Sequence, residues 1–141
     1  MFEAKVTKGG TLKITVPIYH GVRKKYMIGL NWYGTAHYRA RNKVKQEYSI
    51  RVGKVLESLE NDVNITSPFT THFKIYYKNK VSDGDNLVAV AGKFLLDALQ
   101  EHGIVDDDNV QHHTSSSWEV VEQDRHSPRI EVTIKGIKND K

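Results

Sequence analysis

Residues 69–77 read Phe-Thr-Thr-His-Phe-Lys-Ile-Tyr-Tyr. This segment is rich in aromatic and β-branched residues, which fit the pleated, half-buried surface of a sheet, so it is the strongest strand signal in the chain. A turn composition follows at residues 82–86, and a helical pattern runs from about Asn86 to Glu101, with Gly103 where a glycine often ends a helix. The rest of the fold is inferred outward from this strand, turn and helix.

The upstream half predicts one more strand and one more helix. Residues 12–17 alternate apolar and polar side chains, which is typical of a strand. Residues 21–34 are predicted to be a basic and aromatic loop. From about Ala36 to Leu59, apolar residues recur at a spacing of three to four, which predicts an amphipathic helix.

Downstream, residues 118–122 and 129–137 predict two strands, and the polar turn between them is typical of a hairpin. The predicted order is therefore β-α-β-α-β-β. We expect a single domain over residues 1–141 of the α/β (α+β) class, with a mixed β-sheet and helices packed on one face.

The composition limits the classes of protein that fit. The chain has 141 residues, of which 38% are hydrophobic and 27% charged, and it contains no cysteine. This excludes disulfides and thiolate metal sites. No apolar run approaches the roughly 20 residues of a membrane helix, and the N-terminus lacks the apolar core of a signal peptide. We therefore expect a cytoplasmic protein without a membrane partner.

Charge divides the chain into two halves. Residues 1–80 carry 15 Lys and Arg against 5 Asp and Glu, whereas residues 81–141 carry 6 against 12. A basic half suits a polyanion such as nucleic acid. An acidic half would repel DNA unless a cation such as Mg²⁺ neutralised its carboxylates. Solvated surface is the alternative explanation for both halves.

Carboxylates stand at both ends of the predicted helix 86–101. Asp83 and Asp85 precede it, and Asp107 and Asp108 follow Gly103. Residues two apart in an extended segment point the same way, so Asp83 and Asp85 can face one point in space. Because gathered like charges are unfavourable without a neutralising cation, the pattern favours a site for a hard divalent ion.

Structural roles also explain each cluster separately. Asp85 can cap the helix, Asp-Gly-Asp-Asn is a common turn composition, and the run 106–108 is typical of a solvated loop. An EF-hand is excluded because Leu87 stands where the third oxygen ligand is required. The pair His112-His113 is interpreted as surface or packing histidine, since Mg²⁺ prefers oxygen ligands.

Taken together, these residues resemble the signature of the RusA family of Holliday junction resolvases. The signature consists of Asp83-Gly-Asp85-Asn-Leu, a helix bearing Lys93 and then Asp97-Ala-Leu, Gly103, and the pair Asp107-Asp108. The resemblance is specific over residues 75–110, and residues 129–134 are similar to the family's terminal strand. The first 65 residues agree only in their basic and aromatic character.

The resemblance implies a RusA-like fold and a function in DNA recombination and repair. Members are homodimeric, Mg²⁺-dependent endodeoxyribonucleases, common in bacteriophages and prophages, that cut four-way DNA junctions symmetrically; Mn²⁺ can substitute. By this resemblance Asp83, Asp85 and Asp108 are catalytic, metal-binding carboxylates, Asp107 is a further metal candidate, and Lys93 is the essential lysine. Asn86 and Asp97 would support the motif. The expected location is the bacterial cytoplasm.

The lysine departs from the family's best-known spacing. There it follows Asp-Asn-Leu almost at once, whereas here residues 88–92 intervene and Ala89 occupies the nearer position. Four extra residues are close to one helical turn, so Lys93 keeps its face and moves about 6 Å along the axis. Lys93 is aligned through the downstream spacing to Asp97 and Gly103.

The basic half supplies the candidates for DNA contact. A four-way junction has near two-fold symmetry, so the simplest enzyme is a two-fold dimer, with residues 69–77 or the basic helix at its interface. Trp32 or Tyr33 is a candidate wedge in the junction, although such aromatics are more often partly buried anchors. The candidate DNA-binding residues are Arg23, Lys24, Lys25, Arg39, Arg41, Lys43 and Lys45.

Other functions stay open. A protein that binds branched DNA without cutting it would need the basic half but not the carboxylates. A metal-dependent hydrolase of small phosphates would not need the basic half. A structural phage protein, the third alternative, would form large oligomers.

Overall fold

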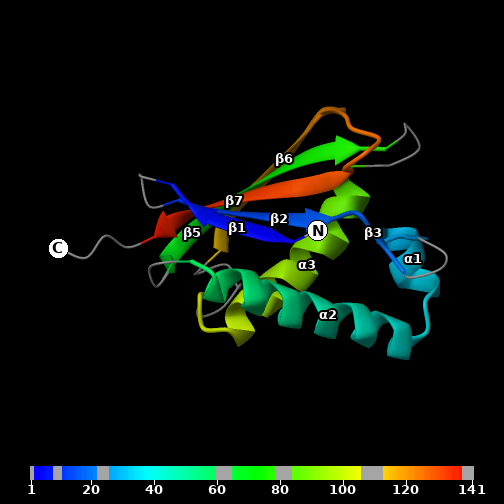
Figure 1. The fold of residues 1–141 in the computed structure, drawn as a ribbon, viewed down its shortest axis with the longest axis horizontal. Helices are drawn as coiled ribbons and strands as arrows, with labels where there is room; N and C mark the ends of the chain where they lie inside the picture. The colour runs from blue at the N-terminus through cyan, green and yellow to red at the C-terminus, as the bar shows by residue number, and fades with distance from the viewer. Residues whose placement is uncertain are drawn as a thin grey trace.

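The computed structural model describes residues 2–7, 11–21, 26–59, 65–78, 84–105 and 113–137, without the side chains of 66, 67, 84–86, 114 and 137. Seven strands and three helices are found in these ranges (Figure 1). In chain order they are β1 (Glu3–Val6), β2 (Leu12–Pro17), β3 (Tyr19–His20), β4 (Tyr26–Met27), α1 (Leu30–Thr35), α2 (Tyr38–Glu57), β5 (Ile65–Tyr77), α3 (Gly84–Glu101), β6 (His113–Gln123) and β7 (Arg129–Ile137).

Five strands form one mixed sheet in the order β1-β2-β7-β5-β6, and β3 pairs separately with β4. Strands β5 and β6 run parallel, whereas the other neighbours in the large sheet are antiparallel. The helix α3 is the connection between the two parallel strands, as parallel pairing requires. The predicted α/β class, with a mixed sheet, is confirmed.

The predicted hairpin between residues 118–122 and 129–137 is wrong. Strand β5 lies between β6 and β7, so these two strands are not neighbours in the sheet. The burial of their side chains explains this order. Ile130, Val132 and Ile134 of β7 are at most 1% exposed, which requires a position inside the sheet, whereas residues 115–123 of β6 are exposed, which suits an edge strand.

Strand β5 is in the interior of the sheet because both of its edges are hydrogen-bonded, to β6 and to β7. Neither edge of β5 is open to a strand of a second copy, and the expectation that residues 69–77 or the basic helix form a dimer interface stays a prediction. Alternate residues Phe69, Phe73 and Ile75 are buried, at 1–2% exposure. Phe73 is paired with Val132 of β7 and with Trp118 of β6, so apolar side chains of three strands share one face.

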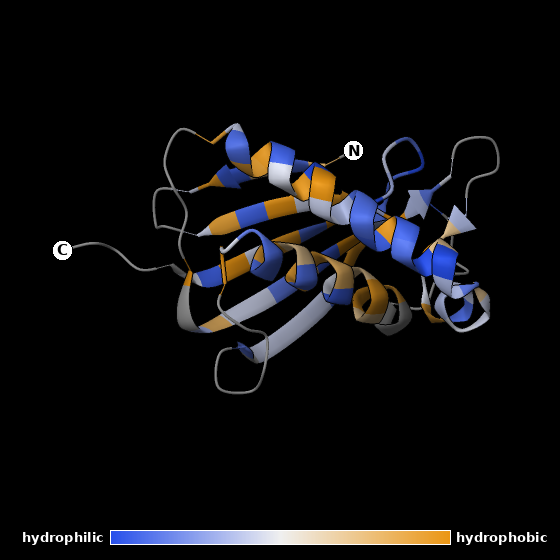
Figure 2. Ribbon diagram, turned by 90° about the horizontal axis from the view of Figure 1, so that it is seen from below, coloured by the Kyte–Doolittle hydropathy of each residue, from blue (hydrophilic) through white to orange (hydrophobic). Residues whose placement is uncertain are grey.

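The helices α2 and α3 cover that same face, as predicted (Figures 1 and 2). Each helix buries an apolar stripe: that of α2 packs on α3 and β1, and that of α3 packs on the sheet, α1 and α2. In α2 the stripe is Val44, Tyr48 and Val52. In α3 it comprises Leu87, Val90, Ala91, Phe94, Leu95, Ala98 and Leu99.

Residues 26–35 differ from the predicted loop. They form β4 and then the short helix α1. The ring of Trp32 stacks on Tyr26 at 5.5 Å and meets the edge of Phe94 at 6.4 Å. These contacts with a distant helix order the segment, whereas the local sequence, with Gly29 and Gly34, gave no helical signal. Within the described ranges, none of the helices combines the length and apolarity needed to cross a membrane.

Substitution of Gly136 tests the close contact between β7 and β5. Its φ of +121° is strained for any other residue, and an added Cβ would lie 2.8 Å from Phe69 Cβ and 2.9 Å from the Pro68 carbonyl oxygen. We expect Gly136→Ala to lower the free energy of unfolding by at least about 2 kcal/mol, measured by urea denaturation. The control Gly34→Ala, whose Cβ would meet nothing within 4 Å, should leave stability unchanged or raise it by up to about 1 kcal/mol. Equal effects of the two substitutions would contradict this account.

The burial of His20 leads to a prediction of how the free energy of unfolding depends on pH. Its ring is 6% exposed, stacks on Tyr48, and has Nδ1 3.5 Å from Glu47 Oε1. Burial lowers the pKa of His20 below its ordinary value, outweighing the opposite effect of Glu47. The unfolded chain therefore takes up a proton first, and stability is present above the ordinary histidine pKa and lost as pH falls through it. We expect His20→Leu to flatten the fall in unfolding free energy between pH 7 and pH 5.5, with little change in slope above pH 7. An undiminished slope in the variant would exclude His20 as its source.

Candidate functional site

Helix α3 carries the central part of the predicted site. It begins at Gly84, so Asp85 and Asn86 lie in its first turn, where the backbone but not their side chains is described. Asp83, Asp107 and Asp108 lie outside the described residues. Leu87 is 1% exposed, so the motif is anchored to the core immediately after its acidic positions.

The C-terminus of α3 is set by a glycine, as predicted. Gly103 has a φ of +77°, and its N–H donates to the carbonyl of Gln100 at 3.1 Å. The next N–H, of Ile104, donates to the carbonyl of Leu99 at 2.8 Å, which completes a Schellman motif. Ile104 in turn accepts from the N–H of Ile65, which ties this end of α3 to the start of β5.

The two acidic segments are attached to opposite ends of this helix. Residue 83 precedes Gly84, and residues 106–108 follow Val105, which is buried beyond the last turn. A helix of 18 residues places its two ends about 26 Å apart. The convergence of Asp83, Asp85 and Asp108 is therefore not shown within one chain.

Lys93 lies on the side of α3 that faces α2. Its Nζ is 3.9 Å from Asp97 Oδ2, and the same oxygen is 3.7 Å from Lys45 Nζ on α2. The side chain of Lys93 is 53% exposed. Its Cα lies eight residues after Asp85, about 12 Å along the axis. Lys93 and Asp97 thus lie together on one side of α3, whereas a role of Lys93 in catalysis stays a prediction.

The candidate DNA-binding residues of α2 fall into two pairs along the helix. Arg39 and Lys43 are exposed on one side. Arg41 and Lys45 are engaged with protein groups, because the Arg41 guanidinium lies 4.9 Å from the centre of the Tyr33 ring and Lys45 faces Asp97. Arg23, Lys24 and Lys25 lie outside the described residues.

The position of these cations is unfavourable for the helix itself. Arg39 and Arg41 stand in the first turn of α2, which contains no acidic residue. The N-terminus of a helix carries a partial positive charge, so each cation there is destabilising by a few tenths of a kilocalorie per mole or more. The contacts of Arg41 with the ring and the carbonyl oxygen of Tyr33 give it a structural role, whereas the exposed Arg39 is free to contact a polyanion.

Trp32 and Tyr33 act as anchors and not as free side chains. Both are partly buried, and both rings lie within 6.4 Å of the Phe94 ring on α3. The alternative that they are partly buried anchors agrees with this packing.

Three basic residues were missed by the sequence interpretation. Lys78, Arg125 and His126 line one cavity at the end of the sheet where β5 and β6 both finish. Lys78 is 47 residues away in the chain from Arg125, which His126 follows directly. Only the parallel register of β5 with β6 brings them together, and no local pattern signals that register.

The described residues offer no clustered set of side chains that could bind a metal ion. In this part of the chain, no group of three or more His, Asp or Glu side chains is placed to hold an ion. The carboxylates assigned to Mg²⁺ all lie in the segments or side chains left undescribed. Their carboxylate oxygens are the donors that Mg²⁺ prefers, so the residue types fit the ion.

No model of a protein family matches the chain, and no curated protein sequence matches it significantly. The function is therefore argued from the residues and their geometry.

Lys93→Gln separates a structural role from a functional one. An exposed pair with a distance of 3.9 Å should contribute less than about 0.5 kcal/mol to stability. We expect the urea unfolding curve of Lys93→Gln to match that of Lys54→Gln, an exposed substitution in the last turn of α2, within this margin. A loss above 2 kcal/mol would show that Lys93 is needed for folding, and activity data on the variant would then say nothing about catalysis.

Proposed function

We propose that this protein is an Mg²⁺-dependent endodeoxyribonuclease that cuts four-way DNA junctions, of the type found in the RusA family. One observation carries the proposal: the Asp83–Leu87 motif falls at the start of α3, a helix packed beside the basic helix α2. DNA recombination and repair would be its setting, in the cytoplasm of a bacterial cell, encoded by a phage or prophage.

The acidic motif supports metal binding by its position. Asp83 and Asp85 flank Gly84, the first residue of α3, and a helix N-terminus also favours negative charge. One acidic residue would be enough to stabilise the N-terminus of the helix. A second carboxylate, together with Asp107 and Asp108 further along the chain, would be held more favourably by a shared cation.

The length of α3 bears on how the two acidic segments would meet. With attachment points about 26 Å apart, a common ion is most simply held between Asp83 and Asp85 of one copy and Asp108 of another. Symmetrical cleavage of a two-fold junction also calls for a two-fold dimer. Strand β6 offers an edge for such an interface, since its Trp118, Val120 and Val121 are 40–49% exposed.

Each group has a defined task in the reaction. Bound Mg²⁺, for which Mn²⁺ can substitute, would polarise the scissile phosphate and lower the pKa of a water molecule. The carboxylates of Asp83, Asp85 and Asp108 would hold the ion, with Asp107 as a neighbouring acid. The exposed Arg39 and Lys43 would bind DNA phosphates, and Lys93 would stabilise the charge that develops on the phosphate.

Removal of one carboxylate tests the proposal. We expect Asp85→Asn and Asp83→Asn to reduce cleavage of a synthetic four-way junction by at least about 100-fold in Mg²⁺, while junction affinity changes less than about threefold. The control Glu57→Gln removes one exposed charge from the end of α2 and should cut normally. Cleavage would be followed on denaturing gels and affinity by fluorescence anisotropy.

The alternatives predict different outcomes in this assay. Full cleavage by either Asp variant would reject the metal role. Wild-type protein that binds the junction but leaves it uncut at every Mg²⁺ concentration would indicate a DNA-binding protein without nuclease activity. DNA binding with a weak dependence on salt would favour a hydrolase of small phosphates.

A mixture of variants tests the shared site. Asp85→Asn and Asp108→Asn, co-expressed with two different tags, should form heterodimers in which one of two sites is intact. Those heterodimers should nick one strand, although neither homodimer cuts. Inactive heterodimers would show that each site is built from a single chain.

A further inference from the structure

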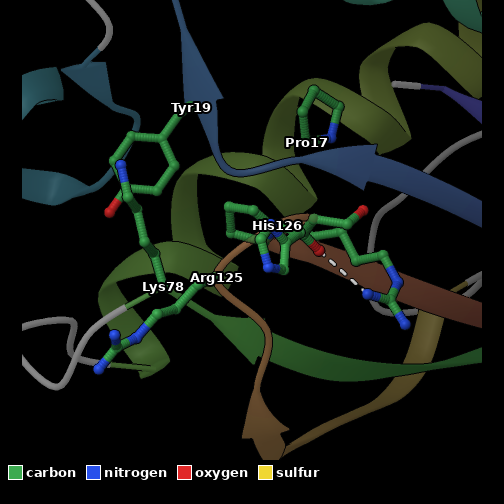
Figure 3. Close-up of a pocket in the computed structure, with 8 residues that line it drawn as sticks. Pro17, Tyr19, Lys78, Arg125 and His126 are labelled. Atoms are coloured by element: carbon green, nitrogen blue, oxygen red, sulfur yellow. Dashed lines mark hydrogen bonds between the residues drawn. The ribbon is translucent and has the colours of Figure 1, made fainter.

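We infer that the cavity at the end of β5 binds a phosphate group of a nucleic-acid backbone. The cavity has a volume of about 400 Å³ and lies where β2, β5 and the β6–β7 connection meet (Figure 3). Its walls are Pro17, Tyr19, Lys78, Arg125, His126, Ser127, Pro128 and Arg129. That it binds DNA in particular rests on the proposed function, whereas phosphate binding does not.

A fixed turn positions the basic side chains. The Arg129 guanidinium donates to Asp124 Oδ2 and Glu131 Oε2, both at 2.8 Å, and to the carbonyl oxygen of Ser127 at 3.0 Å. Asp124 Oδ1 accepts from the N–H of Ser127, and the Asp124 N–H donates to the carbonyl of Tyr77. The turn is therefore held to β5 and β7 at several points, with Arg125 and His126 exposed on it.

Both nearby carboxylates are satisfied by Arg129. The hydrogen bonds from Arg129 and from the Ser127 backbone lower the pKa of Asp124, so this group is ionised and paired. Neither Asp124 nor Glu131 lines the cavity. Arg129 is thus the internal counter-ion of the turn, and Lys78 and Arg125 are left to face a ligand.

The cavity walls suit an anion attached to an apolar group. In the part of the chain that is described, neither Lys78 nor Arg125 forms an ion pair, and the Lys78 ammonium lies 5.5 Å from the centre of the Tyr19 ring. Lys and Arg together supply eight N–H donors and no acceptor, which fits the oxygens of a phosphate. Tyr19, Pro17 and Pro128 add apolar surface against which a sugar or base can pack.

The cavity lies at the same end of the sheet as the acidic motif. Lys78 follows the last residue of β5, and Gly84 begins α3 six residues later. A chain of that length spans at most about 21 Å. A DNA strand whose backbone passes the start of α3 is therefore within a few nucleotides of this cavity, which would hold a phosphate on the same strand as the scissile one.

Inorganic phosphate tests the site without any nuclease activity. Wild-type protein would be titrated with sodium phosphate against sodium chloride at constant ionic strength, and the NMR signals of the His126 ring and of the backbone amides of residues 125–127, which wild-type and variant proteins both retain, followed. We expect saturable shifts of these signals in phosphate, lost in the double variant Lys78→Gln/Arg125→Gln. Lys135→Gln, an exposed control on β7, should retain them. Shifts that do not saturate, or that survive in the double variant, would overturn the site.

DNA binding provides the second measurement. Removal of two phosphate contacts should weaken binding of a four-way junction at least about fivefold at low salt, and should reduce the slope of log K against log salt by about 1–2. Lys135→Gln should change neither. Unchanged affinity and slope in the double variant would overturn the DNA role of the cavity. That outcome differs from failure of the nuclease proposal, which Asp85→Asn tests by cleavage alone.

Discussion

The parallel pairing of β5 with β6 is the constraint on which the rest of the structure depends. Parallel neighbours cannot be joined by a tight turn, so the chain must cross back over one face of the sheet, and α3 makes this crossing. The crossing places Gly92 against Phe73 of the sheet and turns Phe94 toward α1 and α2, so that α3 supplies the surface on which α2 packs. It also fixes the two ends of the sheet: β5 and β6 both finish beside the start of α3, whereas the other end of α3 is tied to Ile65 at the start of β5.

Local sequence patterns predicted the helices and strands well, but predicted less well which strands pair with each other in the sheet. The helical patterns of α2 and α3, the glycine at position 103 and the aromatic and β-branched composition of residues 69–77 are properties of short segments, and each prediction made from them was confirmed. The hairpin of β6 and β7 was wrong because a polar turn between two strands does not show what lies between them in the sheet. The burial of Ile130, Val132 and Ile134 requires partners on both sides, and only β2 and β5 supply both.

The residues of the candidate site also fall into those that a local sequence pattern could place and those that only tertiary packing brings together. Lys93 and Asp97 are one helical turn apart, and their proximity follows from the helical repeat. Lys45 joins them only because α2 packs on α3, which the sequence did not reveal. Lys78 and Arg125 come to line one cavity through a strand register with two irregularities, at Phe69/Thr70 and Ile75/Tyr76, so even a correct strand assignment would have misplaced them. The carboxylates of the proposed metal site were assigned by resemblance to a family, and that assignment stays a prediction.

Two groups of basic side chains carry positive charge that is concentrated at particular places in the structure. Arg39 and Arg41 oppose the dipole of α2, and Lys78 and Arg125 surround a cavity whose nearby carboxylates are already paired with Arg129. Like charges gathered at a surface repel each other, which opposes the local contacts that Arg41 makes with Tyr33 and Lys78 with Tyr19. Both groups of cations would be stabilised by a bound polyanion, because they neutralise its phosphates and its counter-ions are released into the solvent. Because α3 starts at the end of the sheet that bears this cavity, a backbone held by Lys78 and Arg125 would run toward Asp85 and not toward the acidic segment after Val105. A single chain would then grip its DNA beside one half of the proposed metal site, and the other half would have to come from a second copy.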